Sequence, residues 1–339
     1  SGSRNTFIGY TAGDGGTTSA PFSSGQYNTV VGAEAFDVFT TGEYNSIFGY
    51  QSGDAITTGN LNVAMGRSAL GAETIGISTV AIGDNAGSQQ NFGSHAATGN
   101  VMVGSGAGFW NVTGTGNTYL GASAGTGASG NSNSNNTSVG NSSLTSITTG
   151  TQNTVMGQNA GQNITTGTSN VIIGRVAAYA STDVDKTVII GEQAAYTGNM
   201  TSDADGTVSI GNGASKNITS GIGNVSVGFG ALTTENDGDF NTAIGHQALT
   251  AQTGTSGTVA NTVMGYQAGF ALTTGNNNTF IGYKSAGVGV VTGISNTAIG
   301  VTALQALTSG GTNTALGTRA GLVLTEGDSN TFVGKDAGD

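Results

Sequence analysis

The apolar and polar positions of this chain repeat as a short phrase from one end to the other. The phrase is Asn, then Thr or Val, an apolar residue, a large apolar residue and Gly, as in residues 28–32 (NTVVG) and 241–245 (NTAIG). It occurs nineteen times, and twelve of the eighteen spacings between its glycines are 17 residues. Self-similarity at such a period is typical of a solenoid in which each repeat forms one coil. We predict an all-β, parallel β-solenoid (β-roll) of about nineteen 17-residue coils, with residues 1–339 as a single repetitive rod.

Three residues of each phrase alternate as in a β-strand. The residue before the glycine is large and apolar in all nineteen copies, and the residue two places earlier is β-branched in eighteen. This pair predicts the buried face of a strand. The residue between them is also apolar, in sixteen copies. A strand that is apolar on both faces is normally covered on both.

The second apolar face needs a cover, because a 17-residue coil is narrow and has one interior. Two covers remain open: further copies of the same chain, or the chain's own loops folded over a flattened coil. We favour self-association along the whole length. The predicted interface consists of the middle residues of the strands, represented by Phe7, Ile47, Tyr119, Ile172, Phe280 and Phe332.

Other repeated positions describe the corners of the coil. The third residue after each glycine is Ala or Ser, which indicates tight packing, and the tenth is Gly in eleven of the twelve 17-residue coils. We expect the latter glycines to provide positive φ at sharp corners. The Asn of the phrase is expected to form a hydrogen-bonded ladder from coil to coil. Longer spacings predict loops inserted near residues 14–21, 88–97, 126–135, 196–205 and 251–260.

Composition narrows the function. Acidic residues outnumber basic ones by 19 to 8, which disfavours nucleic acid and anionic membrane surfaces as partners. The chain has no Cys, which excludes thiol catalysis, disulfides and thiolate metal sites. Its 61 Gly do not recur every third residue and there is one Pro, so collagen is excluded.

Catalytic chemistry has few candidates. Of the two histidines, His246 follows a phrase glycine at a variable, solvated position, and His95 lies in a predicted surface loop. Acidic residues at 203–206 and 237–239 lack EF-hand spacing, so solvated turns are favoured over a calcium site. A sugar-processing enzyme would need paired carboxylates in a groove. The acidic residues of this chain fall mostly at single, variable positions of the repeat. We predict no enzyme activity, no cofactor and no metal.

Four tyrosines share the position after the phrase glycine: Tyr10, Tyr50, Tyr266 and Tyr283. Their rings either fill grooves between neighbouring coils or chains, or offer flat amphipathic faces to sugars and proteins. They are the candidate surface contacts.

The phrase resembles the repeat of YadA-like trimeric autotransporter adhesin heads and of bacteriophage tail-fibre shafts. The resemblance rests on runs such as residues 278–283 (NTFIGY) and 265–269 (GYQAG), and it covers the whole chain. It implies a β-roll, left-handed in the adhesin heads, with three chains around one axis. The 17-residue period is longer than in adhesin heads, and the Thr-Thr-Gly corner is closer to the tail-fibre style.

We therefore expect an extracellular, homotrimeric structural protein. The first interpretation is the shaft of a phage tail fibre that holds a distal receptor-binding tip away from the virion. The alternative is a bacterial surface adhesin head that binds host or matrix directly. The expected partners are other copies of the chain, adjoining fibre or capping domains, and a cell-surface glycan or protein receptor. The chain is expected to be a fragment of a longer fibre.

Overall fold

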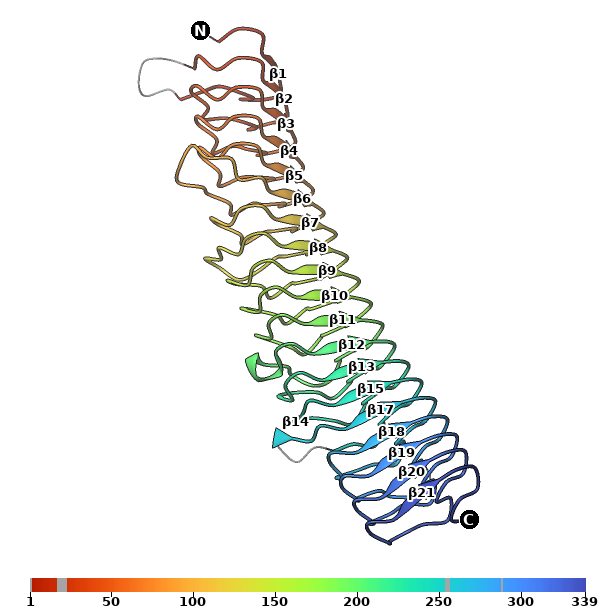
Figure 1. The fold of residues 1–339 in the computed structure, drawn as a ribbon. Helices are drawn as coiled ribbons and strands as arrows, with labels where there is room; N and C mark the ends of the chain where they lie inside the picture. Colours follow the sequence, from red (N-terminus) through yellow and green to blue (C-terminus); the bar gives the residue numbers. More distant parts are fainter. Residues whose placement is uncertain (1, 17–22, 254–256, 288) are drawn as a thin grey trace. The chain divides into compact units, whose positions relative to one another are not determined.

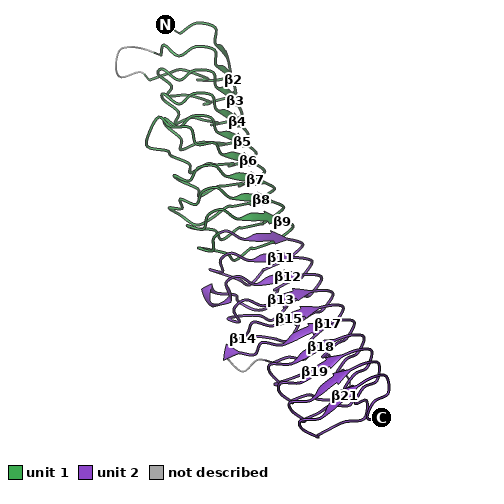
Figure 2. Cartoon of the chain, viewed as in Figure 1, with its two compact units in different colours: residues 1–168 green, residues 169–339 purple. Residues whose placement is uncertain are grey.

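The structure, a computed structural model, describes residues 2–16, 23–253, 257–287 and 289–339. It divides into two compact units, Ser1–Thr168 and Ser169–Asp339 (Figure 2). Within the described residues each unit is a parallel β-solenoid without α-helices (Figure 1), which confirms the predicted fold class. Of the predicted insertions, residues 17–21 and 254–256 lie outside the described residues.

Every phrase forms a three-residue strand. The strands of the first unit are β1 (Thr6–Ile8), β2 (Thr29–Val31), β3 (Ser46–Phe48), β4 (Val63–Met65), β5 (Val80–Ile82), β6 (Val101–Val103), β7 (Thr118–Leu120), β8 (Thr137–Val139) and β9 (Thr154–Met156).

In the second unit the corresponding strands are β10 (Val171–Ile173), β11 (Val188–Ile190), β12 (Val208–Ile210), β13 (Val225–Val227), β15 (Thr242–Ile244), β17 (Thr262–Met264), β18 (Thr279–Ile281), β19 (Thr297–Ile299), β20 (Thr314–Leu316) and β21 (Thr331–Val333). Two short strands, β14 (Gly238–Asp239) and β16 (Gly257–Thr258), pair outside this series. A 3-10 turn, Ser202–Ala204, lies in the predicted insertion 196–205.

The strands pair in register, each residue beside its equivalent in the next coil. Ile47 of β3 pairs with Ala64 of β4, and Ile172 of β10 pairs with Ile189 of β11. Because equivalent residues stack, each position of the phrase becomes a column along the unit. A column therefore has one environment, inside or outside, over many coils.

The faces of the strands are the reverse of the prediction. The middle residue points into the chain's own core: Ile47, Tyr119, Ile172 and Phe280 are fully buried. Phe7 of β1 and Phe332 of β21 are partly exposed. The residue before the glycine, predicted to be buried, points outward. The predicted interface is corrected accordingly for Ile47, Tyr119, Ile172 and Phe280, since a side chain enclosed in its own coil has no surface for a partner. The interface role of Phe7 and Phe332, which keep exposed surface, stays a prediction.

In many coils the core pairs a large residue with a small one. A small middle strand residue then accompanies a large fourth residue after the glycine, as in Ala64 with Leu70. A large middle residue accompanies Gly or Ala there, as in Tyr119 with Gly125, whereas Ala81 with Gly87 does not follow the pattern. A Cβ at Gly125 would lie 2.5 Å from the Tyr119 ring. Alternation of large and small groups gives a narrow interior close packing.

The Ala or Ser column was predicted to lie at a tightly packed corner, and it belongs to the buried core. Ala35, Ser52 and Ala69 are fully buried. Their burial agrees with the tight packing predicted for this column.

The corner glycines have a different role from the predicted one. Gly42 and Gly59 have no positive φ, but a Cβ at either would lie 2.7 or 2.6 Å from the carbonyl oxygen of the equivalent glycine in the next coil. The phrase glycines do have positive φ, for example +133° at Gly49. Close approach of neighbouring backbones, and not backbone conformation, therefore requires Gly at the corners.

The Asn ladder is confirmed. Asn45 is buried, and its Nδ2 donates to the Gly59 carbonyl oxygen at 2.9 Å. Its Oδ1 accepts the backbone N–H of Asn62, at 3.0 Å between N and O, so the column links three successive turns of chain. Thr takes the place of Asn at Thr79, Thr187 and Thr207.

Replacement of Asn45 tests the ladder. Asn45→Ala leaves the Gly59 carbonyl and the Asn62 N–H buried without these partners, so we expect a loss of about 2–4 kcal/mol in the free energy of unfolding. The matched variant Asn45→Thr uses a residue that this column accepts elsewhere, and should lose about half as much. Chemical denaturation followed by circular dichroism measures both; equal losses would contradict the assigned role of the side-chain amide.

Candidate functional site

An outward apolar stripe runs along each unit, formed by the residue before each phrase glycine. In the first unit it includes Met65, Leu120 and Met156, and in the second Met264, Leu316 and Val333, all between 42% and 66% exposed. The Thr or Val two places earlier stands on the same outer face. Contiguous apolar surface of this kind on a soluble protein marks an interaction site. The stripe lies on the face of the strands opposite to the middle residues.

The four candidate tyrosines lie on the surface after the strands. Tyr10, Tyr50, Tyr266 and Tyr283 are 44–76% exposed within the chain, so the chain itself does not bury them in grooves. The Glu34 carboxylate raises the pKa of the Tyr50 hydroxyl. Tyr266 and Tyr283 belong to neighbouring coils, and their rings are near-parallel, 5.3 Å apart.

These two tyrosines continue an aromatic row that the sequence analysis did not assemble. Phe229, His246, Tyr266 and Tyr283 occupy the same column of four successive coils, with ring centroids 5.1–5.3 Å apart and angles of 9–19° between rings. His246 is exposed within the row, which confirms its predicted solvated position. The signal was present in the sequence, since the four residues have the same offset from their glycines.

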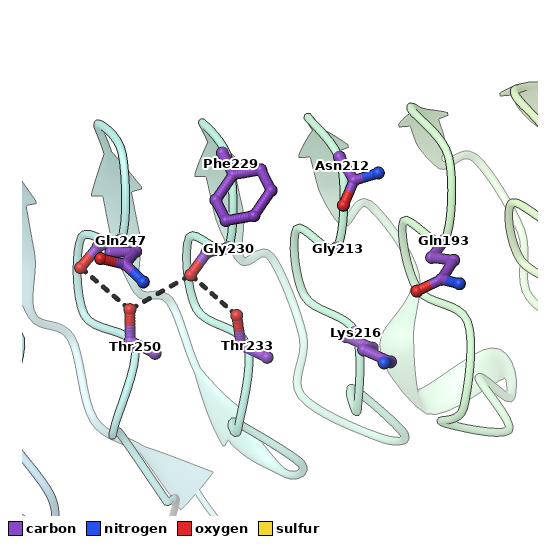
Figure 3. A pocket seen from close by; sticks show the side chains of 9 residues that line it. All are labelled: Gln193, Asn212, Gly213, Lys216, Phe229, Gly230, Thr233, Gln247 and Thr250. Atoms are coloured by element: carbon purple, nitrogen blue, oxygen red, sulfur yellow. Dashed lines mark hydrogen bonds between the residues drawn. The ribbon is translucent and has the colours of Figure 1, made fainter.

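A hollow lies beside the start of this row (Figure 3). Its volume is about 270 Å³. The lining residues come from the turns that follow β11, β12, β13 and β15: Gln193, Asn212, Gly213, Lys216, Phe229, Gly230, Thr233, Gln247 and Thr250. No residue of the hollow belongs to the outward apolar stripe.

Two buried carboxylates were missed by the sequence analysis. Glu73 is fully buried, in a core column where other coils have apolar residues such as Ile56. Its Oε1 accepts the backbone N–H groups of Thr74, Ile75 and Gly76 at 2.7–3.1 Å. In the preceding coil, Thr57 N–H instead donates to a carbonyl of the next coil. The Glu73 carboxylate takes the place of such a carbonyl in the coil that precedes the insertion at 88–97.

The second oxygen of Glu73 binds the inserted coil. Its Oε2 accepts from Gln90 Nε2 at 3.0 Å and from the backbone N–H of Phe92 at 3.2 Å. Gln90 Nε2 also donates to Thr79 Oγ1, at 2.9 Å. A buried charge is tolerated here because both oxygens accept several hydrogen bonds.

The same bonds from three consecutive backbone N–H groups to a Glu oxygen occur in the second unit. Glu235 is buried, and its Oε1 accepts the N–H groups of Asn236, Asp237 and Gly238 at 2.9–3.3 Å. Gln252 stands in this column one coil later, beside the insertion at 251–260. In both units a Glu of this core column is followed, one coil later, by a Gln that lies in a predicted insertion. The sequence alone could therefore have indicated the two buried carboxylates. This pattern indicates a structural role, not catalysis.

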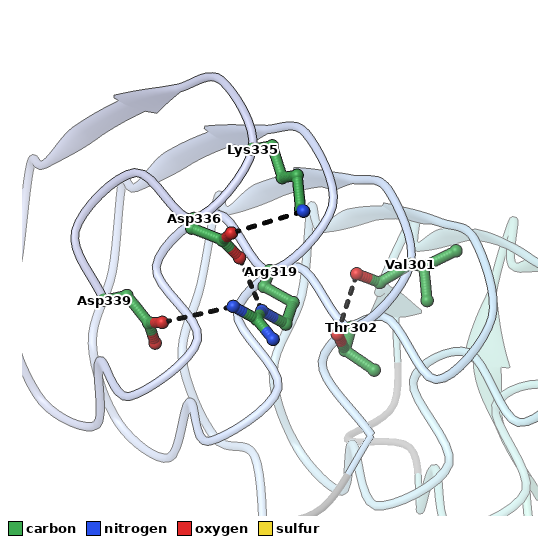
Figure 4. A network of polar contacts seen from close by, with 6 residues as sticks. All are labelled: Val301, Thr302, Arg319, Lys335, Asp336 and Asp339. Atoms are coloured by element: carbon green, nitrogen blue, oxygen red, sulfur yellow. Dashed lines mark hydrogen bonds and ion pairs between the residues drawn. The ribbon is translucent and has the colours of Figure 1, made fainter.

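Charged residues on the surface pair between neighbouring coils. Arg67 donates to both carboxylate oxygens of Asp84, at 2.8 and 2.9 Å, and holds the pKa of Asp84 below its usual range. At the end of the chain, Arg319 contacts Asp336 and Asp339 (Figure 4). Such exposed pairs contribute little to stability.

The remaining chemical candidates have structural partners. His95 is exposed, as predicted for a loop residue, and its Nε2 lies 2.7 Å from Thr58 Oγ1. Asp205 Oδ1 accepts the N–H of Asp185, and Asp239 Oδ1 accepts the N–H of Ile222, at 2.8 and 2.9 Å. Within the described ranges, no three His, Asp or Glu side chains gather closely enough to bind a metal ion. Nor does any helix in those ranges have the length and apolarity to cross a membrane.

No protein-family model and no curated protein matches this chain.

The Glu73 site makes a testable prediction. Glu73→Gln places an amide donor opposite Gln90 Nε2 and the Phe92 N–H, so we expect the free energy of unfolding to fall by about 2–3 kcal/mol. The control Glu326→Gln changes the same group at an exposed position and should alter it by less than about 0.5 kcal/mol. Chemical denaturation compares the two; a Glu73→Gln protein as stable as the control would contradict the role given to the carboxylate.

Proposed function

We propose that the protein is the structural shaft of a homotrimeric extracellular fibre, in the manner of a bacteriophage tail fibre. The function is mechanical: a stiff stack of coils holds a distal receptor-binding tip away from the particle. No catalytic step, cofactor or metal is assigned to the chain. The roll is proposed to be left-handed, and its further partners to be adjoining fibre or capping domains and a surface receptor.

The outward apolar stripe is the observation that supports this proposal best. Each unit keeps large apolar residues at the outer end of every strand, although Gly, Thr and Asn dominate the rest of its surface columns. A second and a third copy of the same chain have the same stripe at the same spacing, because all copies have the same sequence. Stacked columns also suit a load-bearing element, since neighbouring coils are joined by the strand ladder, the Asn ladder and the corner carbonyls.

The alternative is an adhesin head whose own surface binds host or matrix. It has the same fold and the same stripe, and it differs in using the exposed aromatic column for contact. The aromatic row of Phe229, His246, Tyr266 and Tyr283 is the observation that favours it.

Solution mass tests the assembly. The chain weighs 33.2 kDa, and we expect light scattering after size exclusion to give three times this mass. A folded protein with the mass of one chain would refute the trimer.

A substitution on the stripe tests the interface. Leu120→Asp places a charge on the outer face of β7, 47% exposed in the single chain, and burial of an unpaired charge between chains is costly. We expect dissociation at micromolar concentration with the circular dichroism spectrum retained. The matched control Thr113→Asp changes an exposed corner of the same coil and should remain trimeric. Dissociation of both variants, or of neither, would contradict the assigned face.

A further inference from the structure

The hollow of the second unit arises from two missing side chains. The second residue after the phrase glycine is Gln193, Gly213, Gly230 and Gln247 in four successive coils. The two glutamines close the ends, and the two glycines leave the floor open (Figure 3).

Neither glycine is required by the backbone or by packing. Gly213 and Gly230 have φ of +65° and +60°, yet Gln193 and Gln247 adopt +58° and +55° at the same position of their coils. A Cβ at Gly213 would have no atom within 4 Å, and one at Gly230 would have nothing closer than 3.4 Å. The absence of a side chain at Gly213 and Gly230 therefore leaves the space that forms the hollow.

One wall of the hollow is an exposed aromatic ring. Phe229 is 53% exposed, and Figure 3 shows its ring almost face-on, next to Gly230. Three polar side chains line the hollow beside this ring: Gln193, Asn212 and Gln247. Gln247 Oε1 already accepts a hydrogen bond from Gln267, so the amide N–H groups of Gln247 remain as donors. An apolar face with a few convergent polar groups, at a volume close to the smallest small-ligand sites, is typical of binding pockets.

The opposite wall provides a positive charge. Lys216 lines the hollow and lies over the ring of Tyr196, with Nζ 5.8 Å from its centroid. It makes no ion pair with any carboxylate in the described part of the chain. The carboxylate nearest in sequence to Gln193, that of Glu192, pairs with Arg175. A chain with a net charge of −11 thus has one unpaired cation at this hollow.

We propose that the hollow binds an acidic pyranose sugar, such as a uronic acid residue of a surface polysaccharide. The C–H face of the ring lies on Phe229, the hydroxyl groups bond to Asn212, Gln193 and Gln247, and the carboxylate faces Lys216. Thr233 donates its hydroxyl hydrogen to the Gly230 carbonyl at 2.7 Å. The Thr250 hydroxyl lies 2.9 Å from the Gln247 carbonyl oxygen and 3.2 Å from that of Gly230, so its hydrogen is also used within the chain. Both hydroxyl oxygens can therefore act as acceptors toward a ligand. The site goes beyond the proposed function, since it assigns to the shaft a ligand of its own.

Saturation-transfer NMR on the full chain tests the site, with methyl β-D-glucuronide and methyl β-D-glucoside as probes. We expect transfer to the glucuronide with an affinity in the millimolar range, and about ten-fold weaker binding of the glucoside. Lys216→Met should lower glucuronide binding to the level of the glucoside. Equal binding of both probes by the parent protein overturns the acidic-sugar assignment, and no transfer to either probe overturns the site.

Filling the hollow gives the decisive variant. The double change Gly213→Gln and Gly230→Gln introduces a residue that this column accepts in adjacent coils, and should abolish transfer. The control Gly106→Gln changes the equivalent glycine of a first-unit coil, which has φ +65° and one atom near its Cβ position, at 3.9 Å; it should bind as the parent does. Binding retained by the double variant overturns the proposal. Solution mass should stay the same in all variants, so a failure here is separate from a failure of the trimer.

Discussion

The close approach of neighbouring coils is the constraint on which the rest of the structure depends. A strand of three residues contributes few hydrogen bonds, so a coil is stable only when its corners and its core also meet the next coil. At the corners, this brings a carbonyl oxygen to within 2.7 Å of where a Cβ would stand at Gly42. The Asn of the phrase then bonds to the carbonyl of such a glycine. Gly and Asn are thus paired requirements: one allows the approach and the other satisfies the backbone groups that it buries.

The same constraint explains the two buried carboxylates. Where an inserted loop moves the next coil's backbone away, three N–H groups lose their carbonyl partner, and an apolar residue in the core column could not replace it. Glu73 and Glu235 provide an oxygen at that point from inside the coil. Their charge is held by bonds to three consecutive backbone N–H groups, so a residue type that is rarely buried becomes suitable for the core.

Much of the fold could be predicted from the sequence because repetition makes each position visible many times. The strands, the period, the tight Ala or Ser column and the Asn ladder all agree with the structure. The inward face of the strand was assigned wrongly, since alternation alone identifies two faces without saying which one is inside. The uniformly large residues of the outer column suggested a core, whereas the true core column varies from Ala64 to Tyr119. In many coils that variation is compensated at the fourth residue after the glycine, and this pairing of sizes is a sequence signal for the inner face.

The candidate sites were less predictable because they depend on residues from several coils. The hollow beside Phe229 lies where two glycines, Gly213 and Gly230, are adjacent in one column, whereas Gly106 of the same column stands between coils that have side chains there. Its aromatic and charged walls come from different columns. Inner columns are fixed by packing and by hydrogen bonds, and a change there affects every neighbouring coil. Outer columns after the phrase glycine contain Tyr10, Arg67, Glu192, Phe229 and Lys335 at one equivalent position. A solenoid of this kind can therefore acquire a binding surface by changing outer residues alone, without any change in the coil that supports them.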